Sequence, residues 1–394
     1  MNFGAIFILI DFNITRDLSI NGILFPLGVY MDEKIKNEKS GRNLGLDITR
    51  ILAFFSVVGV HFFLNTDFYK NPIVGYRMYL LVFLRTSFMI CVPLFLLLTG
   101  YLVSSKEISM DFTSLKKYYT KIIGILISYA LSMVFVVVIL SVKDFEKLSI
   151  KNILMDILAF KHYAWYVNMY LGLFFLSPFL NLIWHEICDK RVHMILLAIF
   201  LALTILPSVF NVYDLSSIKT LNSSKSLSHI VPDWWINLFP ITYYYIGAYM
   251  RKYLDFNKIK AKKILLYLLM VLLVNSCYNV LRSKGGNFQS QAWNSWGSLE
   301  NTLSSTLFFI LINSSMSNKK NNTLAKFLSY FSSLTFSAYL LSAASDKYIY
   351  AYVNKYIGPV KASMVYMPLI VLSSALTALI LASLVERLKK IIRK

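Results

Sequence analysis

The sequence GLDITRILAFFSVVGVHFF, residues 45–63, is long and apolar enough to cross a membrane, yet it carries Asp47, Arg50 and His61. A bilayer core about 30 Å thick needs about 20 apolar residues in a helix. An ionised side chain at the centre of such a helix costs about 2.5–3.5 kcal/mol on insertion scales, so it normally faces a partner or a polar cavity. The stretch therefore predicts a membrane helix with a functional polar face.

The spacing of these residues defines that face. Arg50 and His61 are eleven positions apart, which places them within about 20° around a helix and about 16 Å apart along it. Asp47 lies one turn before Arg50, so we expect an Asp47–Arg50 pair. Asp47 is too far from His61 to orient it, at about 21 Å along the helix, so the group that orients the imidazole must come from another helix. The alternatives are that Asp47 and Arg50 reach the aqueous interface and that His61 is an interfacial histidine.

The whole chain has the composition of a membrane protein. Of its 394 residues, 57% are hydrophobic, whereas soluble proteins contain about 45–50% apolar residues. A window of about 19 residues finds ten hydrophobic segments. We therefore predict an all-α fold, a polytopic membrane helical bundle of about ten transmembrane helices. The segments are residues 44–63, 78–103, 117–142, 164–184, 192–210, 234–252, 262–281, 298–316, 327–350 and 364–385.

The loops between these segments differ in charge. The set of alternate loops that begins with residues 31–43 holds nearly twice as many Lys and Arg as the other set. The positive-inside rule therefore places both termini in the cytoplasm. This bias explains the formal net charge of +20 without a nucleic-acid partner. The three cysteines match no metal-ligand spacing, so we expect no metal site.

The chain divides into three parts. Residues 1–43 form an N-terminal extension and cytoplasmic lead-in, residues 44–385 the ten-helix membrane domain, and residues 386–394 a basic cytoplasmic tail. Charged residues interrupt the short apolar run near the N-terminus, which is not typical of a cleaved signal peptide. We expect either that Met31 is the true start of the protein or that residues 1–30 form a loosely structured extension.

The second helix also carries a charge. Arg85 lies about a third of the way in from the predicted outer face, roughly level with His61. A buried arginine in a membrane helix indicates function or a pair with an acid, and the sequence does not identify such an acid. Pro93 follows on the same helix and predicts a kink.

Four segments carry a family signature. In LDITRILAFFSVVGVH (46–61), Leu-Asp-x-x-Arg is followed by a histidine eleven residues after the arginine, and VPLFLLLTGYL (92–102) closes an apolar run on Thr-Gly-Tyr. HYAWYVNMYLGLFFLSP (162–178) and FSSLTFSAYLLS (331–342) are weaker matches. Together these segments, between residues 44 and 345, resemble the acyltransferase-3 family of integral membrane acyltransferases.

The resemblance implies a ten-helix bundle that moves an acyl group, usually acetyl, from acyl-CoA to a hydroxyl of a cell-surface glycan or its lipid-linked precursor. It makes His61 the catalytic histidine, Arg50 part of the first-helix pair, and Arg85 the second-helix arginine. The chain departs from the family pattern in three ways. Thr99 replaces a serine, Ser342 stands where many members have a histidine, and no SGNH-type hydrolase domain follows the last helix.

The expected chemistry assigns two sides to the site. His61 is a general base or a transient acyl carrier, and Arg85 stabilises the oxyanion. The phosphates of acetyl-CoA, the acyl donor, are expected to contact a cytoplasmic mouth. Its candidate residues are Asp47, Arg50, Thr99, Tyr101, Lys116, Lys117 and Lys121. The candidates for acceptor binding are His162, Trp165, Tyr166 and Tyr170, which form either a sugar-stacking platform or an interfacial aromatic belt.

Two other functional classes stay open. A transporter or flippase of glycans or lipid-linked oligosaccharides would use Asp47, Arg50 and His61 for proton or anion coupling. A glycosyltransferase with a lipid-linked donor would need a catalytic acid on an outer loop, and the acids there form no motif. The enzyme is expected in the inner (plasma) membrane of a bacterium. Its expected partners are the lipid bilayer, acyl-CoA and a glycan, with a homo-oligomer as a further possibility.

Overall fold

The computed structural model describes residues 43–141, 150–161, 163–213, 228–316 and 323–392. These residues are mostly α-helical and contain no β-strand; an isolated antiparallel bridge joins Pro72 to Asn287. The predicted all-α class is confirmed. The predicted lead-in, apart from Asn43, lies outside the described residues.

All ten predicted hydrophobic segments are helical. In chain order the helices are α3 (Leu44–Asn65), α4 (Tyr76–Phe88), α5 (Cys91–Val103), α6 (Phe112–Tyr119), α7 (Ile122–Leu140), α8 (Ile150–Leu158), α9 (Trp165–Glu186), α10 (Lys190–Thr204), α11 (Pro207–Phe210), α12 (Phe239–Tyr253), α13 (Ala261–Ser283), α14 (Leu299–Met316), α15 (Thr323–Tyr356), α16 (Val360–Ser363) and α17 (Met367–Ile392).

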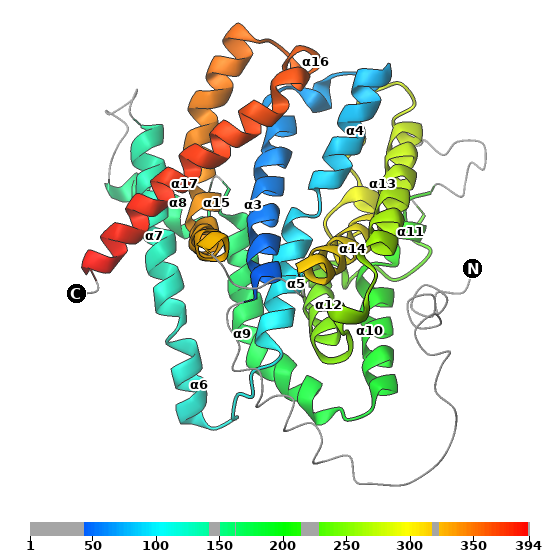
Figure 1. The fold of residues 1–394 in the computed structure, drawn as a ribbon, viewed down its shortest axis with the longest axis vertical. Helices are drawn as coiled ribbons and strands as arrows, with labels where there is room; N and C mark the ends of the chain where they lie inside the picture. The colour runs from blue at the N-terminus through cyan, green and yellow to red at the C-terminus, as the bar shows by residue number, and fades with distance from the viewer. Residues whose placement is uncertain (1–42, 142–149, 162, 214–227, 317–322, 393–394) are drawn as a thin grey trace. The chain divides into compact units, whose positions relative to one another are not determined.

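Helix α3 lies at the centre of the bundle (Figure 1, blue). It begins at Asn43, whose side chain accepts a hydrogen bond from the Gly45 N–H at 2.9 Å and so satisfies one of the free donors of the first turn. It packs against α4, α5, α14, α15 and α17. In its most apolar stretch 72% of the residues are buried, against 22% for α13. The polar residues of α3 therefore face protein.

The predicted second span is two helices. Helix α4 ends at Phe88 and α5 begins at Cys91, so the chain breaks before Pro93 and not at it. Proline has no N–H to donate to the carbonyl four residues earlier, which is that of Met89. The kink predicted from Pro93 is thus a break at Met89 and Ile90, and it creates a helix N-terminus inside the bundle.

Helices α5 and α12 cross at two glycines. A Cβ atom on Gly100 would lie 2.0 Å from the carbonyl oxygen of Tyr244, and one on Gly247 would lie 2.3 Å from that of Leu97. No side chain fits at either distance. The two backbones are therefore in direct contact, as small residues allow in membrane helices.

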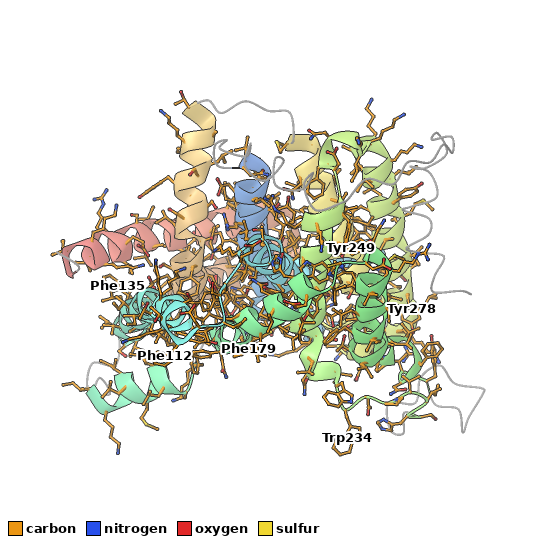
Figure 2. All side chains as sticks on the ribbon, turned by 90° about the horizontal axis from the view of Figure 1, so that it is seen from below. Phe112, Phe135, Phe179, Trp234, Tyr249 and Tyr278 are labelled. Atoms are coloured by element: carbon orange, nitrogen blue, oxygen red, sulfur yellow. The ribbon has the colours of Figure 1, made fainter. Side chains whose placement is uncertain are left out.

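The outer surface of the described bundle is apolar. Phe179 is 50% exposed and points away from α9, and Phe112 at the start of α6 is 82% exposed (Figure 2). Many leucines and isoleucines of α13 and α17 are exposed in the same way. Such a surface is stable only in contact with lipid, so this is a multi-pass membrane protein.

Seven helical segments in the described residues are long and apolar enough to cross a membrane. They are Leu44–Asn65, Tyr76–Val103, Phe112–Leu140, Trp165–Glu186, Ala261–Ser283, Ala325–Tyr356 and Val360–Ile391. The other three predicted spans form α10 with α11, α12 and α14, which are shorter or more polar.

Contacts between α3 and α15 bear on this count. Arg50 contacts Ser332 near the start of both helices, and His61 contacts Asp346 further along both. The two helices are therefore parallel, which requires an odd number of membrane crossings between them. Four of the seven candidate spans lie between α3 and α15, which is an even number. One or all three of the shorter helical segments between them must therefore also cross the membrane. The predicted ten-helix order meets this requirement.

Candidate active site

His61 lies against a buried acid on a neighbouring helix. Its Nδ1 is 2.8 Å from Oδ2 of Asp346 on α15, and the two side chains are only 7% and 2% exposed. The expectation that the orienting group comes from another helix is therefore met by Asp346. When the imidazole is protonated the two form an ion pair away from water, where such a pair interacts strongly.

Asp346 is itself held in place. Ser374 of α17 donates a hydrogen bond of 2.6 Å to Oδ1 of Asp346, and the hydroxyls of Ser374 and Ser345 are 3.1 Å apart. The two carboxylate oxygens thus have separate partners, one on α3 and one on α17. The hydrogen bond at Oδ1 holds the carboxylate so that Oδ2 lies toward the imidazole.

Tyr163, just before α9, covers one face of the imidazole. The ring centroids of Tyr163 and His61 are 3.9 Å apart, with 33° between the planes. Asn65 donates a hydrogen bond to the carbonyl of His61 at 2.8 Å and another to the Tyr163 hydroxyl at 3.4 Å. His61 therefore has a carboxylate at one ring edge and an aromatic ring on one face.

The predicted Asp47–Arg50 pair is confirmed near the start of α3, at the opposite end of its polar face from His61. Arg50 Nη1 is 3.1 Å from Asp47 Oδ1, and it contacts the Ser332 hydroxyl at 3.4 Å. Asp47 is 2% exposed and Arg50 30%, so Asp47 does not reach the interface. Arg50 also interacts electrostatically with Tyr170 on α9. Arg50 is thus charged, partly accessible and joined to α15.

Arg85 is buried at 3% exposure, and the acid that the sequence left unidentified is Glu300 of α14. Glu300 interacts electrostatically with Arg85, whose Nε donates to the Tyr69 hydroxyl at 3.3 Å. The guanidinium lies 4.6 Å from the ring centroid of Phe288. Among the described residues its Nη1 is buried and has no hydrogen-bond partner. That atom is a donor that a bound oxygen could use.

Glu300 belongs to a buried polar network. Both of its carboxylate oxygens accept from Asn279 Nδ2 at 3.0 Å, and Asn279 Oδ1 accepts from Trp293 and Asn294. Asn279 also donates to Thr86, one residue after Arg85. This network ties α13 and α14 to α4 and fixes the surroundings of Arg85.

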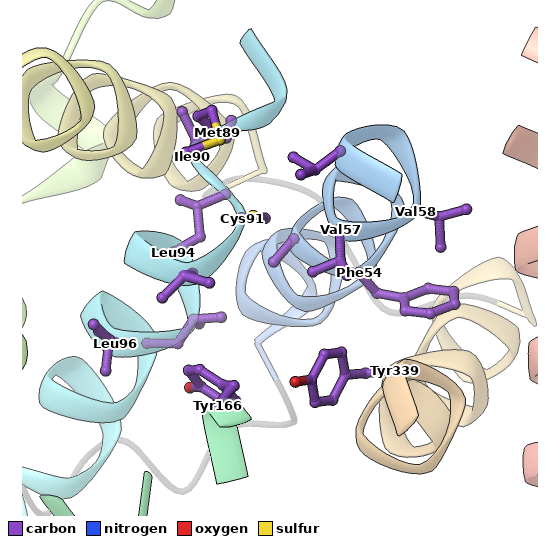
Figure 3. Packing of buried hydrophobic residues seen from close by; sticks show 14 of the residues in the cluster. Phe54, Val57, Val58, Met89, Ile90, Cys91, Leu94, Leu96, Tyr166 and Tyr339 are labelled. Atoms are coloured by element: carbon purple, nitrogen blue, oxygen red, sulfur yellow. The ribbon is translucent and has the colours of Figure 1, made fainter. Parts of the chain in front are cut away.

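Three of the predicted acceptor residues form a row of ring contacts along α9: the centroids of Trp165 and Tyr166 are 6.2 Å apart, and those of Tyr166 and Tyr170 are 6.4 Å apart. Trp165 is 37% exposed and stacks on Trp296 with centroids 4.4 Å apart. Tyr166 is buried in the bundle, where its ring approaches that of Tyr339 near Val57 and Cys91 (Figure 3). Tyr170 interacts with Arg50. Their positions run inward along α9, because a helix carries residues 165 and 170 at different depths. His162 lies outside the described residues.

The predicted donor residues are spread out. Lys116, Lys117 and Lys121 are exposed at α6. Thr99 donates its hydroxyl to the Phe95 carbonyl at 2.8 Å, within its own helix. Tyr101 lies beside Arg251, whose guanidinium is 5.2 Å from the ring centroid and donates to the hydroxyl at 3.4 Å. Arg251 thus adds a cation beside a predicted donor residue.

Asp346, Glu300, Tyr163 and Trp296 were not among the residues selected from the sequence. The sequence could have identified the two acids, Asp346 and Glu300, because both lie within predicted spans, where an ionisable residue indicates function. No spacing rule identifies Tyr163 or Trp296, because each contact joins segments that are far apart in the chain.

A family model for an acyltransferase domain matches residues 43–386. No curated protein and no solved structure matches the chain significantly. The match and the apolar helices define a multi-pass membrane acyltransferase. Because the match covers most of its length, the chain belongs to the acyltransferase-3 family.

Proposed function

We propose that the protein moves an acyl group, acetyl in the simplest case, from acyl-CoA to a hydroxyl of a cell-surface glycan or its lipid-linked precursor, in the plasma membrane of a bacterium. The observation that carries the proposal is the buried pair of His61 and Asp346, 2.8 Å apart. Acyl transfer to a hydroxyl needs a base that removes its proton, and a nearby carboxylate stabilises the imidazolium that this creates.

The proton and the bonds follow from this arrangement. Asp346 faces Nδ1, so Nε2 acts on the acceptor. Nε2 takes the hydroxyl proton as the oxygen bonds to the thioester carbonyl carbon, the C–S bond breaks, and the proton passes to the leaving CoA sulfur. In a second route Nε2 attacks the thioester carbon, the C–S bond breaks and CoA leaves as the thiolate; the hydroxyl oxygen then takes the acyl group from Nε2, and its proton passes to the CoA sulfur. Asp346 favours both routes, because each places positive charge on the ring.

Arg85 supports the proposal from α4. Its buried Nη1 has no hydrogen-bond partner among the described residues. Negative charge develops on the carbonyl oxygen during acyl transfer, and a donor already fixed in a water-poor site stabilises it. Thr86, next to Arg85, is tied to the Glu300 network by Asn279, which limits the movement of this part of α4.

Arg50 supports a donor side distinct from the acceptor side. CoA carries several phosphate charges, and guanidinium groups bind phosphate with two parallel hydrogen bonds. Arg50 is partly exposed near the start of α3, whereas His61 is near its end. We assign Arg50 and the exposed lysines at α6 to acyl-CoA on the cytoplasmic side, and His61 to a hydroxyl that approaches from outside.

The test uses the purified protein in lipid nanodiscs with acetyl-CoA labelled in its acetyl group and a panel of surface glycans. We expect wild type to release CoA and label a glycan, and His61→Ala to do neither. His229→Ala is the matched control, since His229 is 73% exposed and pairs only with a neighbouring acid, Asp233, in its described contacts. This control should retain full transfer.

Two results would overturn the proposal: no transfer by wild type to any glycan, or undiminished transfer by His61→Ala. Label found on His61 before a glycan is added would select the second route. Movement of an unmodified glycan across proteoliposomes, without CoA release, would show a transporter instead.

A further inference from the structure

Two side chains contact the imidazole of His61, and a third contact holds its backbone. Asp346 lies 2.8 Å from Nδ1, Tyr163 lies over one ring face at 3.9 Å between centroids, and Asn65 holds the backbone carbonyl of His61. The contact with the carboxylate restrains one atom of the ring, Nδ1, and leaves the ring free to turn about that atom. A ring stacked on the face removes this freedom.

Tyr163 is suited to that task because its own ring is anchored. Asn65 lies four residues after His61 on α3, and its Nδ2 contacts both the His61 carbonyl and the Tyr163 hydroxyl. Movement of Tyr163 relative to α3 would break the second contact. Tyr163 also directly precedes Ala164, whose N–H donates to the Lys161 carbonyl and whose carbonyl accepts from the Val167 N–H at the start of α9.

The phenol remains neutral at this position. Burial is the main cause that raises the pKa of Tyr163, and the Asp346 carboxylate raises it further. Tyr350, four residues after Asp346, interacts electrostatically with both Asp346 and Tyr163. Tyr163 therefore contributes a neutral ring face to His61, and its hydroxyl interacts with Asp346.

We propose that Tyr163 is a positioning residue for His61, whose ring holds the imidazole in the orientation that directs Nε2 at the acceptor hydroxyl. The inference rests on the proposed acyl transfer by His61. It assigns a task to the segment before α9 that is separate from sugar stacking. It also explains why an aromatic side chain stands between the imidazole and the α9 turn.

The test compares Tyr163→Leu with Tyr163→Phe. Leucine removes the stacked ring, and misplacing a reactive group by about 1 Å lowers rates about 100-fold, so we expect the turnover number to fall about 10- to 100-fold with an unchanged KM for acetyl-CoA. Phenylalanine keeps the ring and loses the hydroxyl, with its 3.4 Å contact to Asn65 and its interaction with Asp346, so it should keep clearly more of the wild-type turnover number than Tyr163→Leu. Tyr79→Leu, at a tyrosine that is 46% exposed on α4, is the matched control and should be fully active.

A second measurement does not depend on turnover. In protein labelled with ¹³C,¹⁵N-histidine, the His61 ring signal is identified by its loss in His61→Gln. The Tyr163 ring current should shift that signal upfield in wild type and in Tyr163→Phe, and the shift should disappear in Tyr163→Leu.

The inference fails if wild type transfers acetyl and Tyr163→Leu has the same turnover number, or if Tyr163→Leu leaves the His61 signal unshifted relative to wild type. Failure of the proposed function looks different. In that case wild type transfers no acetyl, while the ring-current shift still reports the stacked pair.

Discussion

Asp346→Asn would remove one charge from beside His61 while keeping the size of the side chain. The amide oxygen can still accept the hydrogen bond that Ser374 donates at 2.6 Å. The imidazolium formed in proton transfer would lose its counter-charge, and the amide would no longer select the productive tautomer. We expect the turnover number for acetyl transfer to fall at least about 100-fold, measured by CoA release.

Asp67→Asn is the control for this substitution, because Asp67 is 56% exposed and pairs with Lys70 in the loop after α3. It should leave the turnover number unchanged. A D346N enzyme as active as wild type would show that His61 acts without this carboxylate.

At the residue scale, the spacing of residues along one helix predicted the contacts made within that helix. Asp47 and Arg50 are one turn apart and do form a pair at 3.1 Å. The partner of His61 could not be found in this way, because Asp346 is on a distant segment and the packing of α3 on α15 brings it near. The roles assigned to His61, Arg85 and the donor and acceptor residues stay predictions.

At the scale of helices, the crossing of α5 and α12 predicts a stability effect. Gly100→Ala would place a methyl group 2.0 Å from a backbone oxygen of α12, and Gly247→Ala would place one 2.3 Å from a backbone oxygen of α5. Backbone atoms cannot move aside as a side chain can, so the helices must separate. We expect each variant to lose about 1–3 kcal/mol of stability and to aggregate at a lower temperature in detergent.

Gly172→Ala tests whether any glycine substitution has this effect. A Cβ atom there would meet nothing within 4 Å, and alanine favours a helix more than glycine. Its aggregation temperature should equal or exceed that of wild type. Equal losses in all three variants would contradict the proposed role of backbone contact.

The helices themselves were largely predictable, because hydrophobic length is a direct requirement of the bilayer. Their arrangement was not. Apolar residues face both lipid and protein in a membrane bundle, so the sequence of α13 does not reveal that it lies at the periphery, with 22% of its apolar stretch buried, while 72% of that of α3 is buried. The break before Cys91 was predicted only as a kink at Pro93.

For the whole molecule, the proposed orientation can be tested with cysteines. Tyr76 at the start of α4 and Phe112 at the start of α6 are 75% and 82% exposed, and one span separates them. In a background with Cys188→Ser and Cys277→Ser, an impermeant maleimide should modify Tyr76→Cys in intact cells. It should modify Phe112→Cys only after permeabilisation, because positive loops stay in the cytoplasm. The reverse pattern would invert the orientation.

The two contacts between α3 and α15 set a limit on how this chain can change in length. Arg50 contacts Ser332 and His61 contacts Asp346. The two contacts are eleven positions apart on α3 and fourteen positions apart on α15, and both spacings must be kept for both contacts to form. One residue inserted between Arg50 and His61 would turn the imidazole by about 100° around α3 and advance it by about 1.5 Å. Insertions and deletions between these positions should therefore abolish transfer, even where every side chain of the site is retained.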